Sequence, residues 1–348
     1  MAWDFVVAGG GIAGVSVAAE LARRGSVLLV EAEPALAVHT TGRSAAIFLP
    51  SYGGPIIRAL TAASRPRLAD GLLTPLPMLW LGEDATTEIP GSVPIDVARA
   101  RQFCPALRPD AFTSAALDEH TADIDAMGLH QHYVRELRSR GGEIRKGAPI
   151  TALTRNGACW RVGIGPDTVG AGQVVAAAGA WTDRLAELAG VPPVGLRPLR
   201  RTVAIAAGEP IDPAWPLVAD VAETCYFRPE SGALLVSPAD ETPSEPVDAR
   251  PEDLDVARAL DRVNEMTTLK LRTVRTAWAG LRTFAPDRGP VVGARAGHPG
   301  FAFFAGQGGY GIQMAPALAA AGAAAIAGEP IPADVAVTAE QLSPDRFA

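Results

Sequence analysis

The chain has 348 residues, of which 48% are hydrophobic, so it can bury a substantial core and is expected to form two domains or one domain with a large insertion. Its net charge of -7 comes from interspersed acids and bases, and no basic arm points to nucleic acid as a partner. Cys104, Cys159 and Cys225 show no C-x-x-C spacing, which argues against a disulfide framework or a zinc site and suits a reducing compartment.

The N-terminal segment predicts a strand, a glycine turn and a helix. Residues 5–8 are a short apolar run suited to a buried parallel strand, and residues 15–24 have the pattern of a helix. Between them Gly9, Gly11 and Gly14 follow the G-x-G-x-x-G spacing. The first glycine permits a sharp turn, the second lets the backbone approach a pyrophosphate, and the third lets the helix pack on the strand. The helix N-terminus then directs free N–H groups at the phosphates.

A second apolar run, residues 27–30, ends at Glu31. An acid at this distance from the glycines can accept hydrogen bonds from ribose hydroxyls, and it disfavours a 2′-phosphate. The order of strand, glycine turn, helix, strand and acid predicts dinucleotide binding, with FAD and NAD both open at this point.

Two further segments are rich in small residues, HTTGRSAA at 39–46 and VVAAAGAW at 174–181. Both would let the backbone lie close to a large planar ligand. Each is equally typical of an ordinary loop or a core strand, so neither decides the ligand alone.

The regions between these segments carry no nucleotide motif and have their own predicted elements. We expect strands at 78–81, 202–206, 224–227 and 233–237, and helices at 125–140 and 253–271. Nucleotide-type and sheet-type segments therefore alternate, which indicates two interleaved domains. His130 and His132 form an H-x-H pair without further ligands, so we expect no metal site.

The C-terminal region repeats the arrangement of glycines before a helix, in GQGGYGIQ at 306–313. An alanine-rich stretch, residues 315–327, follows and is too short to span a bilayer. We expect a helix that begins near Ile312 and directs partial positive charge at a ligand, while the glycines let the backbone lie against it. A glycine turn ahead of a core helix is the plainer alternative.

Taken in order, these segments, together with WAGLRTFAPDRGPVVG at 278–293 and FAFFAGQGGYGIQ at 301–313, resemble the D-amino acid oxidase/glycine oxidase superfamily of FAD enzymes. Within it the chain is most similar to the D-arginine dehydrogenases. The similarity runs over nearly the whole length and includes RPLRRTVAI at 197–205.

The resemblance implies an α/β fold in which a Rossmann-like FAD-binding domain is interleaved with an α+β substrate domain on a mixed, mainly antiparallel sheet. The FAD-binding domain would comprise residues 1–50, 139–197 and 285–348. The substrate-binding domain would comprise residues 51–138 and 198–284.

The resemblance also implies a cofactor site for non-covalent FAD, since no cysteine lies beside residues 282–293, where some relatives have one. The first helix end would hold the pyrophosphate and the second would face the isoalloxazine ring. The expected cofactor-binding residues are Gly9, Gly11, Ile12, Ala13, Gly14, Glu31, Ala32, Thr40, Thr41, Arg43, Ser44, Ala45, Ala46, Ile150, Ala178, Gly179, Trp181, Gly306, Gly308, Gly309, Tyr310, Gly311, Ile312 and Gln313.

Four residues match substrate-binding positions of the family. Arg282 would hold the substrate carboxylate in a bidentate grip, because an arginine in an apolar strand needs an anionic partner. Tyr226 would be a second carboxylate donor, and Arg201 would lie close by. Tyr52 would belong to a mobile loop over the substrate, with the glycines after it as the hinge. The plainer alternatives are a surface ion pair, a core tyrosine and solvated arginines.

Two departures from the family concern side-chain specificity. An acidic residue that binds cationic substrates aligns with Pro77, and a histidine of the lid-side segment aligns with Ile47. The pocket is therefore expected to be apolar and to lack a counter-ion. We expect a substrate with an apolar or neutral side chain, because an unpaired buried cation would cost several kcal/mol.

The expected reaction is oxidation of a D-amino acid to the imino acid by hydride transfer from Cα to flavin N5, followed by hydrolysis to a 2-oxo acid and ammonia. A quinone, an artificial acceptor or O2 would reoxidise the flavin, with a dehydrogenase favoured. One alternative is an oxidase or dehydrogenase of another small amino or 2-hydroxy acid, and a second is a non-catalytic electron-relay subunit. We expect a monomer or homodimer without an integral membrane segment, located in the cytoplasm or peripheral to the inner membrane face.

Overall fold

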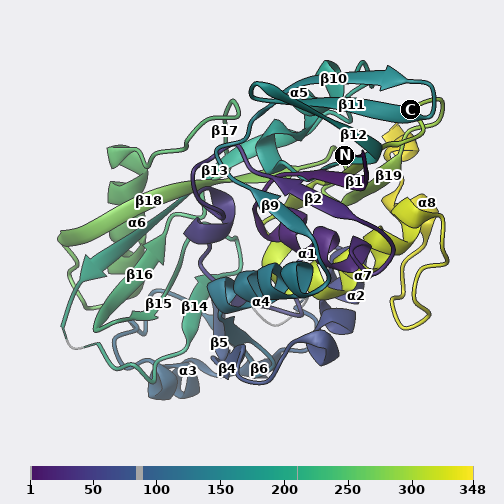
Figure 1. Ribbon diagram of the computed structural model, residues 1–348. Coiled ribbons are helices and arrows are strands. Elements are labelled where there is room, and N and C mark those ends of the chain that lie inside the picture. Colours follow the sequence, from purple (N-terminus) through teal and green to yellow (C-terminus); the bar gives the residue numbers. More distant parts are fainter. Residues whose placement is uncertain (1, 84–88, 210, 348) are drawn as a thin grey trace.

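The computed structural model describes residues 2–83, 89–209 and 211–347. Figure 1 shows two lobes connected by the long strands β13 (Arg197–Ala207) and β18 (Thr273–Phe284). The chain passes between the lobes several times, so residues far apart in sequence lie in the same sheet.

In the described part of the chain, eight strands form the sheet of the first lobe. They are β1 (Ala2–Ala8), β2 (Val27–Val30), β9 (Glu143–Arg145), β10 (Ile150–Asn156), β11 (Cys159–Ile164), β12 (Asp167–Ala176), β19 (Val291–Ala294) and β20 (Phe301–Ala305). The strands β9, β2, β1, β12 and β20 are successive parallel neighbours. Their carboxyl ends therefore meet at one edge, where open α/β sheets bind ligands.

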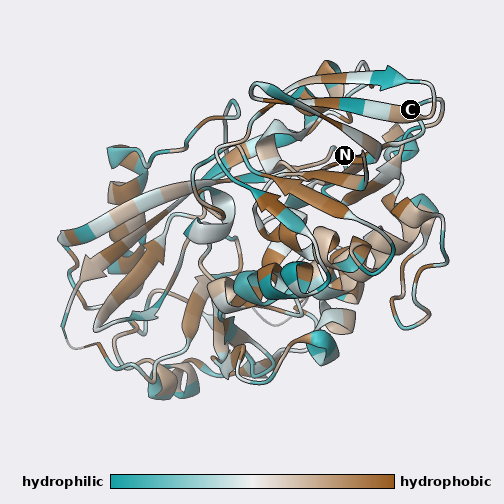
Figure 2. Ribbon diagram, viewed as in Figure 1, coloured by the Kyte–Doolittle hydropathy of each residue, from teal (hydrophilic) through white to brown (hydrophobic). Residues whose placement is uncertain are grey.

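Helices cover this parallel sheet. They are α1 (Ile12–Leu21), α2 (Pro55–Ser64), α4 (Ala126–Ser139) and α7 (Gly311–Ala327). α1 contacts both α4 and α7, and α7 also contacts α2. α1 and α7 are rich in small residues, which permits this close packing. Most residues of α7 are buried as a result. Figure 2 shows that β1 and β2 are hydrophobic, whereas α4 displays a hydrophilic outer face.

The second lobe is built on a mixed, mainly antiparallel sheet of ten described strands. Besides β13 and β18 these are β5 (Met78–Gly82), β6 (Val93–Ile95), β7 (Ser114–Asp118), β14 (Leu217–Asp220), β15 (Tyr226–Glu230), β16 (Ala233–Ser237), β17 (Thr242–Pro243) and β21 (Gln307–Gly308). Only the β14–β5 pair is parallel among the described strands of this sheet. α3 (Val97–Phe103) and α6 (Asp253–Met266) pack on it.

A three-stranded sheet, β3 (Ile47–Phe48), β4 (Leu73–Pro75) and β8 (Ala122–Ile124), lies beside the larger two. Short helices complete the described elements: η1 (Thr40–Arg43), η2 (Arg65–Arg67), η3 (Gly179–Trp181), α5 (Thr182–Leu188), α8 (Ala339–Leu342) and η4 (Pro344–Phe347). The expected α/β architecture with a mixed second sheet is confirmed. The interleaved domain boundaries remain a proposal.

The first helix begins three residues before its expected start. Gly11 has extended backbone at the N-cap, and the Ile12 N–H donates to Thr41 Oγ1 at 3.0 Å. A hydroxyl from a distant segment therefore caps the helix, which the local pattern did not reveal.

The helix expected over residues 253–271 ends early, at Met266. Thr267 turns to extended backbone, and the Asn264 side chain hydrogen-bonds both the N–H and the carbonyl of Leu271. That side-chain bridge replaces the last helical turn. The strand expected at 224–227 instead spans Tyr226–Glu230.

None of the described helices is both long enough and apolar enough to cross a membrane. The longest of the described helices, α7, has 17 residues and contains Pro316.

We predict that Gly14→Ala destabilises the protein. A Cβ atom at Gly14 would lie 1.8 Å from the Gly9 carbonyl oxygen, so the turn or the helix must shift. Overpacking of this kind typically costs about 1–3 kcal/mol, measurable as a lower midpoint of urea unfolding. Gly54→Ala is the control, because a Cβ there meets nothing within 4 Å. Its cost should stay below about 1 kcal/mol, the preference for glycine at an N-cap. Equal midpoints for the two variants would contradict the prediction.

Candidate functional site

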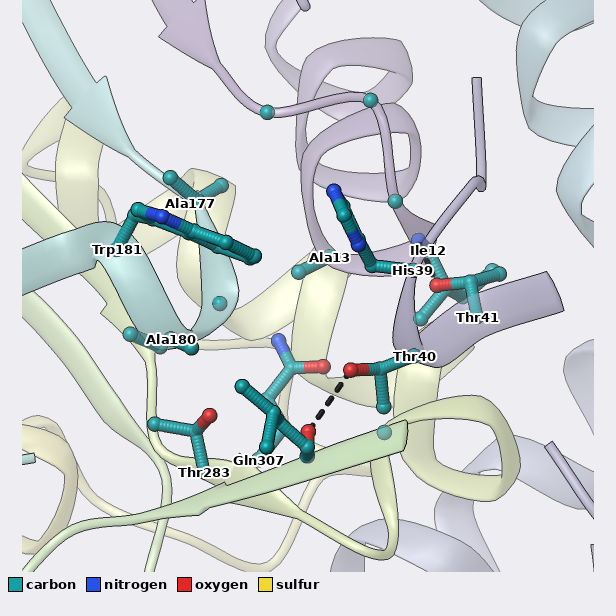
Figure 3. A pocket seen from close by; sticks show the side chains of 18 of the residues that line it. Ile12, Ala13, His39, Thr40, Thr41, Ala177, Ala180, Trp181, Thr283 and Gln307 are labelled. Carbon is teal, nitrogen blue, oxygen red and sulfur yellow. Dashed lines mark hydrogen bonds between the residues drawn. The ribbon is translucent and has the colours of Figure 1, made fainter. Parts of the chain in front are cut away.

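A cavity of about 550 Å³ opens where the carboxyl ends of the parallel strands meet the strand β18. Figure 3 shows the side chains of Ile12, His39, Thr40, Trp181 and Gln307 around it. Most of the expected cofactor residues line this cavity: Gly9, Gly11, Ile12, Ala13, Glu31, Ala32, Thr40, Thr41, Arg43, Ser44, Ala45, Ile150, Ala178, Gly179, Trp181, Gly306, Gly308, Gly309, Gly311 and Ile312.

The first glycine turn is held from two sides. Glu31 Oε2 accepts a hydrogen bond from the Gly10 N–H at 2.6 Å, and Oε1 accepts one from the Glu33 N–H at 2.8 Å. On the other side, the buried His130 contacts the Gly10 carbonyl oxygen through Nε2 at 2.9 Å. Since a carbonyl can only accept, His130 Nε2 carries the proton. Burial lowers the pKa of His130, which keeps the ring neutral.

The turn η1 is fastened to β18 by hydrogen bonds across the cavity wall. Thr40 Oγ1 donates to the Leu281 carbonyl at 2.8 Å, the bond drawn in Figure 3. Arg43 Nη1 donates to the carbonyls of Ala249 and Ala279, and the Trp278 indole donates back to the Arg43 carbonyl at 3.0 Å. Arg43 therefore shapes the cavity through the backbone of the second lobe.

His39 is a cavity residue that the sequence analysis did not single out. Its ring lies against Trp181, with centroids 4.8 Å apart, and its Nε2 lies 3.0 Å from Glu33 Oε1. His39 directly precedes η1 and Trp181 ends η3, and the two rings line the cavity together (Figure 3). The sequence feature that could have identified His39 as a cavity residue is its position at the start of HTTGRSAA.

The second glycine segment lies against the opposite wall. Gly306 and Gly308 have φ of +69° and +54°, a left-handed backbone that side chains disfavour. A Cβ at Gly309 would lie 2.7 Å from Arg282 Nη1. The backbone thus passes directly under the guanidinium, and α7 begins at Gly311, close to the expected position.

A smaller cavity of about 90 Å³ adjoins the large one. The residues that line both are Ser44, Ala45, Arg201, Tyr226, Arg282, Gly309 and Ile312. The others lining the small cavity are mainly apolar: Ala46, Ile47, Leu49, Tyr52, Met78, Trp80, Leu217, Ala219, Glu223, Cys225, Ala239 and Gln313.

Two arginines stand at the junction of the cavities. Arg201 on β13 is opposite Gly280 on β18, so Arg201 and Arg282 are diagonal neighbours on one face of the sheet. Arg201 is buried, and its Nε donates to the Asp240 carbonyl at 2.8 Å. Burial and the charge of Arg282 lower the pKa of Arg201.

Arg282 is half-buried, and within the described chain its guanidinium has no hydrogen bond or ion pair. The buried hydroxyl of Tyr226 beside it also lacks a partner there. Two cations and one hydroxyl therefore converge on a space that an anion would fill.

The mouth of the small cavity holds a carboxylate that the sequence analysis missed. Tyr52 donates its hydroxyl to Glu223 Oε2 at 2.7 Å, and Glu223 is exposed with φ of +53°. The expectation of a pocket without any counter-ion was therefore wrong at its mouth. Burial is the largest cause of the raised pKa of Tyr52.

The remaining expected residues lie elsewhere. Gly14 packs on the first turn, and Tyr310 packs between Tyr52 and Phe284 without lining either cavity. Ala46 lines only the small cavity, as does Gln313, whose amide bonds Leu49 and Thr61 and so joins α7 to α2. Pro77 lines neither cavity; it directly precedes β5, whose residues Met78 and Trp80 line the small cavity instead.

A sequence model of the family described as "FAD dependent oxidoreductase" matches residues 4–325. The chain is 29% identical to the bifunctional tRNA 5-methylaminomethyl-2-thiouridine biosynthesis protein MnmC of Polaromonas sp., over 97% of this chain and 59% of that protein. It spans between 33% and 59% of the lengths of the curated relatives it matches.

Solved structures share the fold. The glycine oxidase of Geobacillus kaustophilus has a TM-score of 0.83 at 20% identity, with 98% of each chain covered. The L-proline dehydrogenase of P. horikoshii has the same score and identity, over 99% of this chain and 97% of that one.

The cavity fits FAD, the cofactor of this family. The large cavity has glycine-lined backbone at two helix N-termini, where phosphates and a reduced ring find positive partial charge. Glu31 lies where an acid meets a ribose, and its oxygens retain lone pairs beyond those used by Gly10 and Glu33.

We predict that Glu31→Ala weakens FAD binding. The variant loses an acceptor for ribose and the bond that holds the Gly10 N–H. Hydrogen bonds to a charged group contribute about 1.5–3 kcal/mol, so the dissociation constant should rise roughly tenfold to a hundredfold. Flavin fluorescence during titration of the apoprotein measures this. The control is Glu143→Ala, which removes an exposed partner of Arg145 on β9 outside the cavity. Unchanged FAD affinity in Glu31→Ala would contradict the assignment.

Proposed function

The chain belongs to the family of FAD-dependent oxidoreductases, and from this premise we propose that it oxidises a small D-amino acid with an apolar or neutral side chain. The product is the imino acid, which water hydrolyses to a 2-oxo acid and ammonia. When bound, FAD supplies the two-electron acceptor for the substrate Cα–H.

The observation that carries this proposal is the cationic cluster between the cavities, in which the Arg282 guanidinium and the Tyr226 hydroxyl have no hydrogen-bond partner within the described chain. Arg282 and Arg201 offer guanidinium donors, and Tyr226 offers a hydroxyl, and all three residues line both cavities. A carboxylate matches a guanidinium in bidentate geometry. Holding the carboxylate there fixes the α-carbon at the boundary between the substrate space and the cofactor space.

The start of α7 contributes electrostatics at the same boundary. Gly309 and Ile312 line both cavities, and the first turn of the helix has N–H groups without intrahelical acceptors. The helix dipole therefore favours negative charge that develops on a ring placed against these residues.

The groups around the small cavity favour a substrate whose amine arrives neutral. Burial raises the pKa of the Tyr52 hydroxyl, and it raises the pKa of the Cys225 thiol to about 12. Both stay protonated at neutral pH, so neither is a base. Glu223 is committed to Tyr52 at the mouth.

The lining of the small cavity supports a neutral side chain. Leu49, Met78, Trp80 and Leu217 are buried and apolar, whereas Glu223, the one carboxylate among the described residues of this lining, is exposed. A cationic side chain inside the cavity would lose its water without gaining a buried anion. We further propose a dehydrogenase whose flavin is reoxidised by a quinone, an artificial acceptor or O2, acting as a monomer or homodimer in the cytoplasm or at the inner membrane face.

We predict that Arg282→Met lowers kcat/KM for the amino acid by roughly 10²–10⁴-fold, because two charge-assisted hydrogen bonds are worth about 3–6 kcal/mol together. Arg282→Lys should retain part of the activity, because lysine keeps the positive charge but cannot form the two parallel hydrogen bonds of a guanidinium. Steady-state kinetics with an artificial electron acceptor measures both variants.

Arg275→Met is the matched control for this prediction. Arg275 lies exposed on the same strand, β18, and lines neither cavity. If Arg282→Met and Arg275→Met had equal kcat/KM, the carboxylate clamp would be wrong.

A substrate panel tests the proposed function directly. We expect D-leucine, D-phenylalanine or D-proline to bleach the oxidised flavin under anaerobic conditions, with D-arginine much slower. Glycine and L-proline belong in the panel, because an enzyme of each kind shares the fold. An electron-relay subunit would show no bleaching by any amino acid.

Side-chain preference is resolved by repeating the panel with Glu223→Gln. A strong D-arginine preference that disappears in this variant would overturn the neutral side chain and assign Glu223 as the counter-ion. A strong preference for L-amino acids would overturn the proposed configuration.

A further inference from the structure

A carboxylate, Glu241, lies among three guanidinium groups at the edge of the candidate site. Its Oε1 forms a long ion pair with Arg201 Nη2 at 3.6 Å, a separation too large for a normal hydrogen bond. Arg288, Arg201 and Arg282 all lower the pKa of Glu241 against the opposing effect of its partial burial. Glu241 is therefore a nearby anion that could pair with the substrate-binding arginines.

Arg288 holds Glu241 away from those arginines. Its Nη2 donates to Glu241 Oε1 at 2.7 Å, and its Nη1 donates to Oε2 at 3.0 Å. This fork occupies both carboxylate oxygens, and bidentate geometry makes the pair stronger than an ordinary surface ion pair.

Arg288 itself is fixed by its surroundings. Its guanidinium carbon lies 3.8 Å from the centre of the Phe284 ring, a cation–π contact. Its φ of +63° is unfavourable for a residue other than glycine, so neighbouring contacts must impose it.

Both partners stand on anchored backbone. Arg346 pairs with the preceding Asp287 through Nε at 2.8 Å, which secures the turn that carries Arg288. Glu241 directly precedes β17, which pairs with β13 beside Arg200. Two features therefore set the distance between Glu241 and Arg201: the pairing of β17 with β13, and the bonds from Arg288 to the Glu241 carboxylate.

We propose that Arg288 is a positioning residue that sequesters Glu241 and so keeps Arg201 and Arg282 free for the substrate carboxylate. Without Arg288, Glu241 has Arg201 as its nearest cation and needs to approach by less than about 1 Å to form a hydrogen bond. It then competes with the substrate carboxylate for the same donors. This inference rests on the proposed function, since it assumes that the arginines bind a carboxylate.

The test is a double-variant comparison with benzoate as the probe carboxylate. Binding to the FAD-loaded protein is measured from the change in flavin absorbance, and KM is measured with the preferred amino acid of the panel. We expect Arg288→Gln to raise the benzoate dissociation constant and KM by about tenfold or more, with a smaller change in kcat. Glu241→Gln in the Arg288→Gln background should restore both values to near those of the parent.

Rescue separates positioning from damage to the fold, because removing a second charge does not repair a distorted turn. Arg346→Gln is the matched control: it breaks the neighbouring ion pair of the same turn and leaves Glu241 bound to Arg288. Thermal unfolding of each variant is measured alongside.

The outcomes distinguish the two proposals. Unchanged benzoate binding in Arg288→Gln, a double variant as weak as Arg288→Gln, or an Arg346→Gln effect of equal size would overturn the role of Arg288 alone. A parent protein that binds neither benzoate nor any amino acid would overturn the carboxylate clamp of the proposed function and this inference with it.

Discussion

Two guanidinium groups of like charge on neighbouring strands are the constraint around which the candidate site is organised. Arg201 and Arg282 are diagonal neighbours across β13 and β18, and burial together with the charge of Arg282 lowers the pKa of Arg201. In the described chain no carboxylate hydrogen-bonds to either. Such an arrangement is costly by itself and becomes favourable once an anion binds, so it favours carboxylate recognition as the task of this surface.

The cofactor cavity depends on bonds between the lobes as much as on its glycine turns. Thr41 caps α1, Thr40 bonds β18, and Arg43 bonds the backbone of the second lobe. The turn that carries these residues thereby connects the first helix to the strand that bears Arg282. A structural change in either lobe should therefore alter the junction of the two cavities, where we propose that the α-carbon of the substrate lies.

The two carboxylates near the site each have a bonding partner of their own. Glu223 is bound by Tyr52 at the mouth, and Glu241 is bound by Arg288 at the edge. Glu241 lies close enough to interact electrostatically with the arginines, since Arg201 and Arg282 both contribute to lowering its pKa. The hydrogen bond from Tyr52 and the ion pair with Arg288 give these carboxylates partners of their own, which leaves the cationic cluster available for a ligand.

The sequence by itself determined the family, the α/β fold class, the FAD cofactor and the place of both glycine turns, because these depend on local spacing and on ordered motifs. It also drew attention to Arg282, Arg201 and Tyr226, whose roles stay predictions. Only the tertiary structure decided that the Thr41 hydroxyl caps the N-terminus of α1 and that Pro77 lines neither cavity. It also placed Glu223 and Glu241 beside the site. The reason is that such contacts join residues far apart in the chain. A periodic sequence pattern specifies on which face of an element a side chain lies. Only the packing of the folded chain specifies which other residues that side chain contacts.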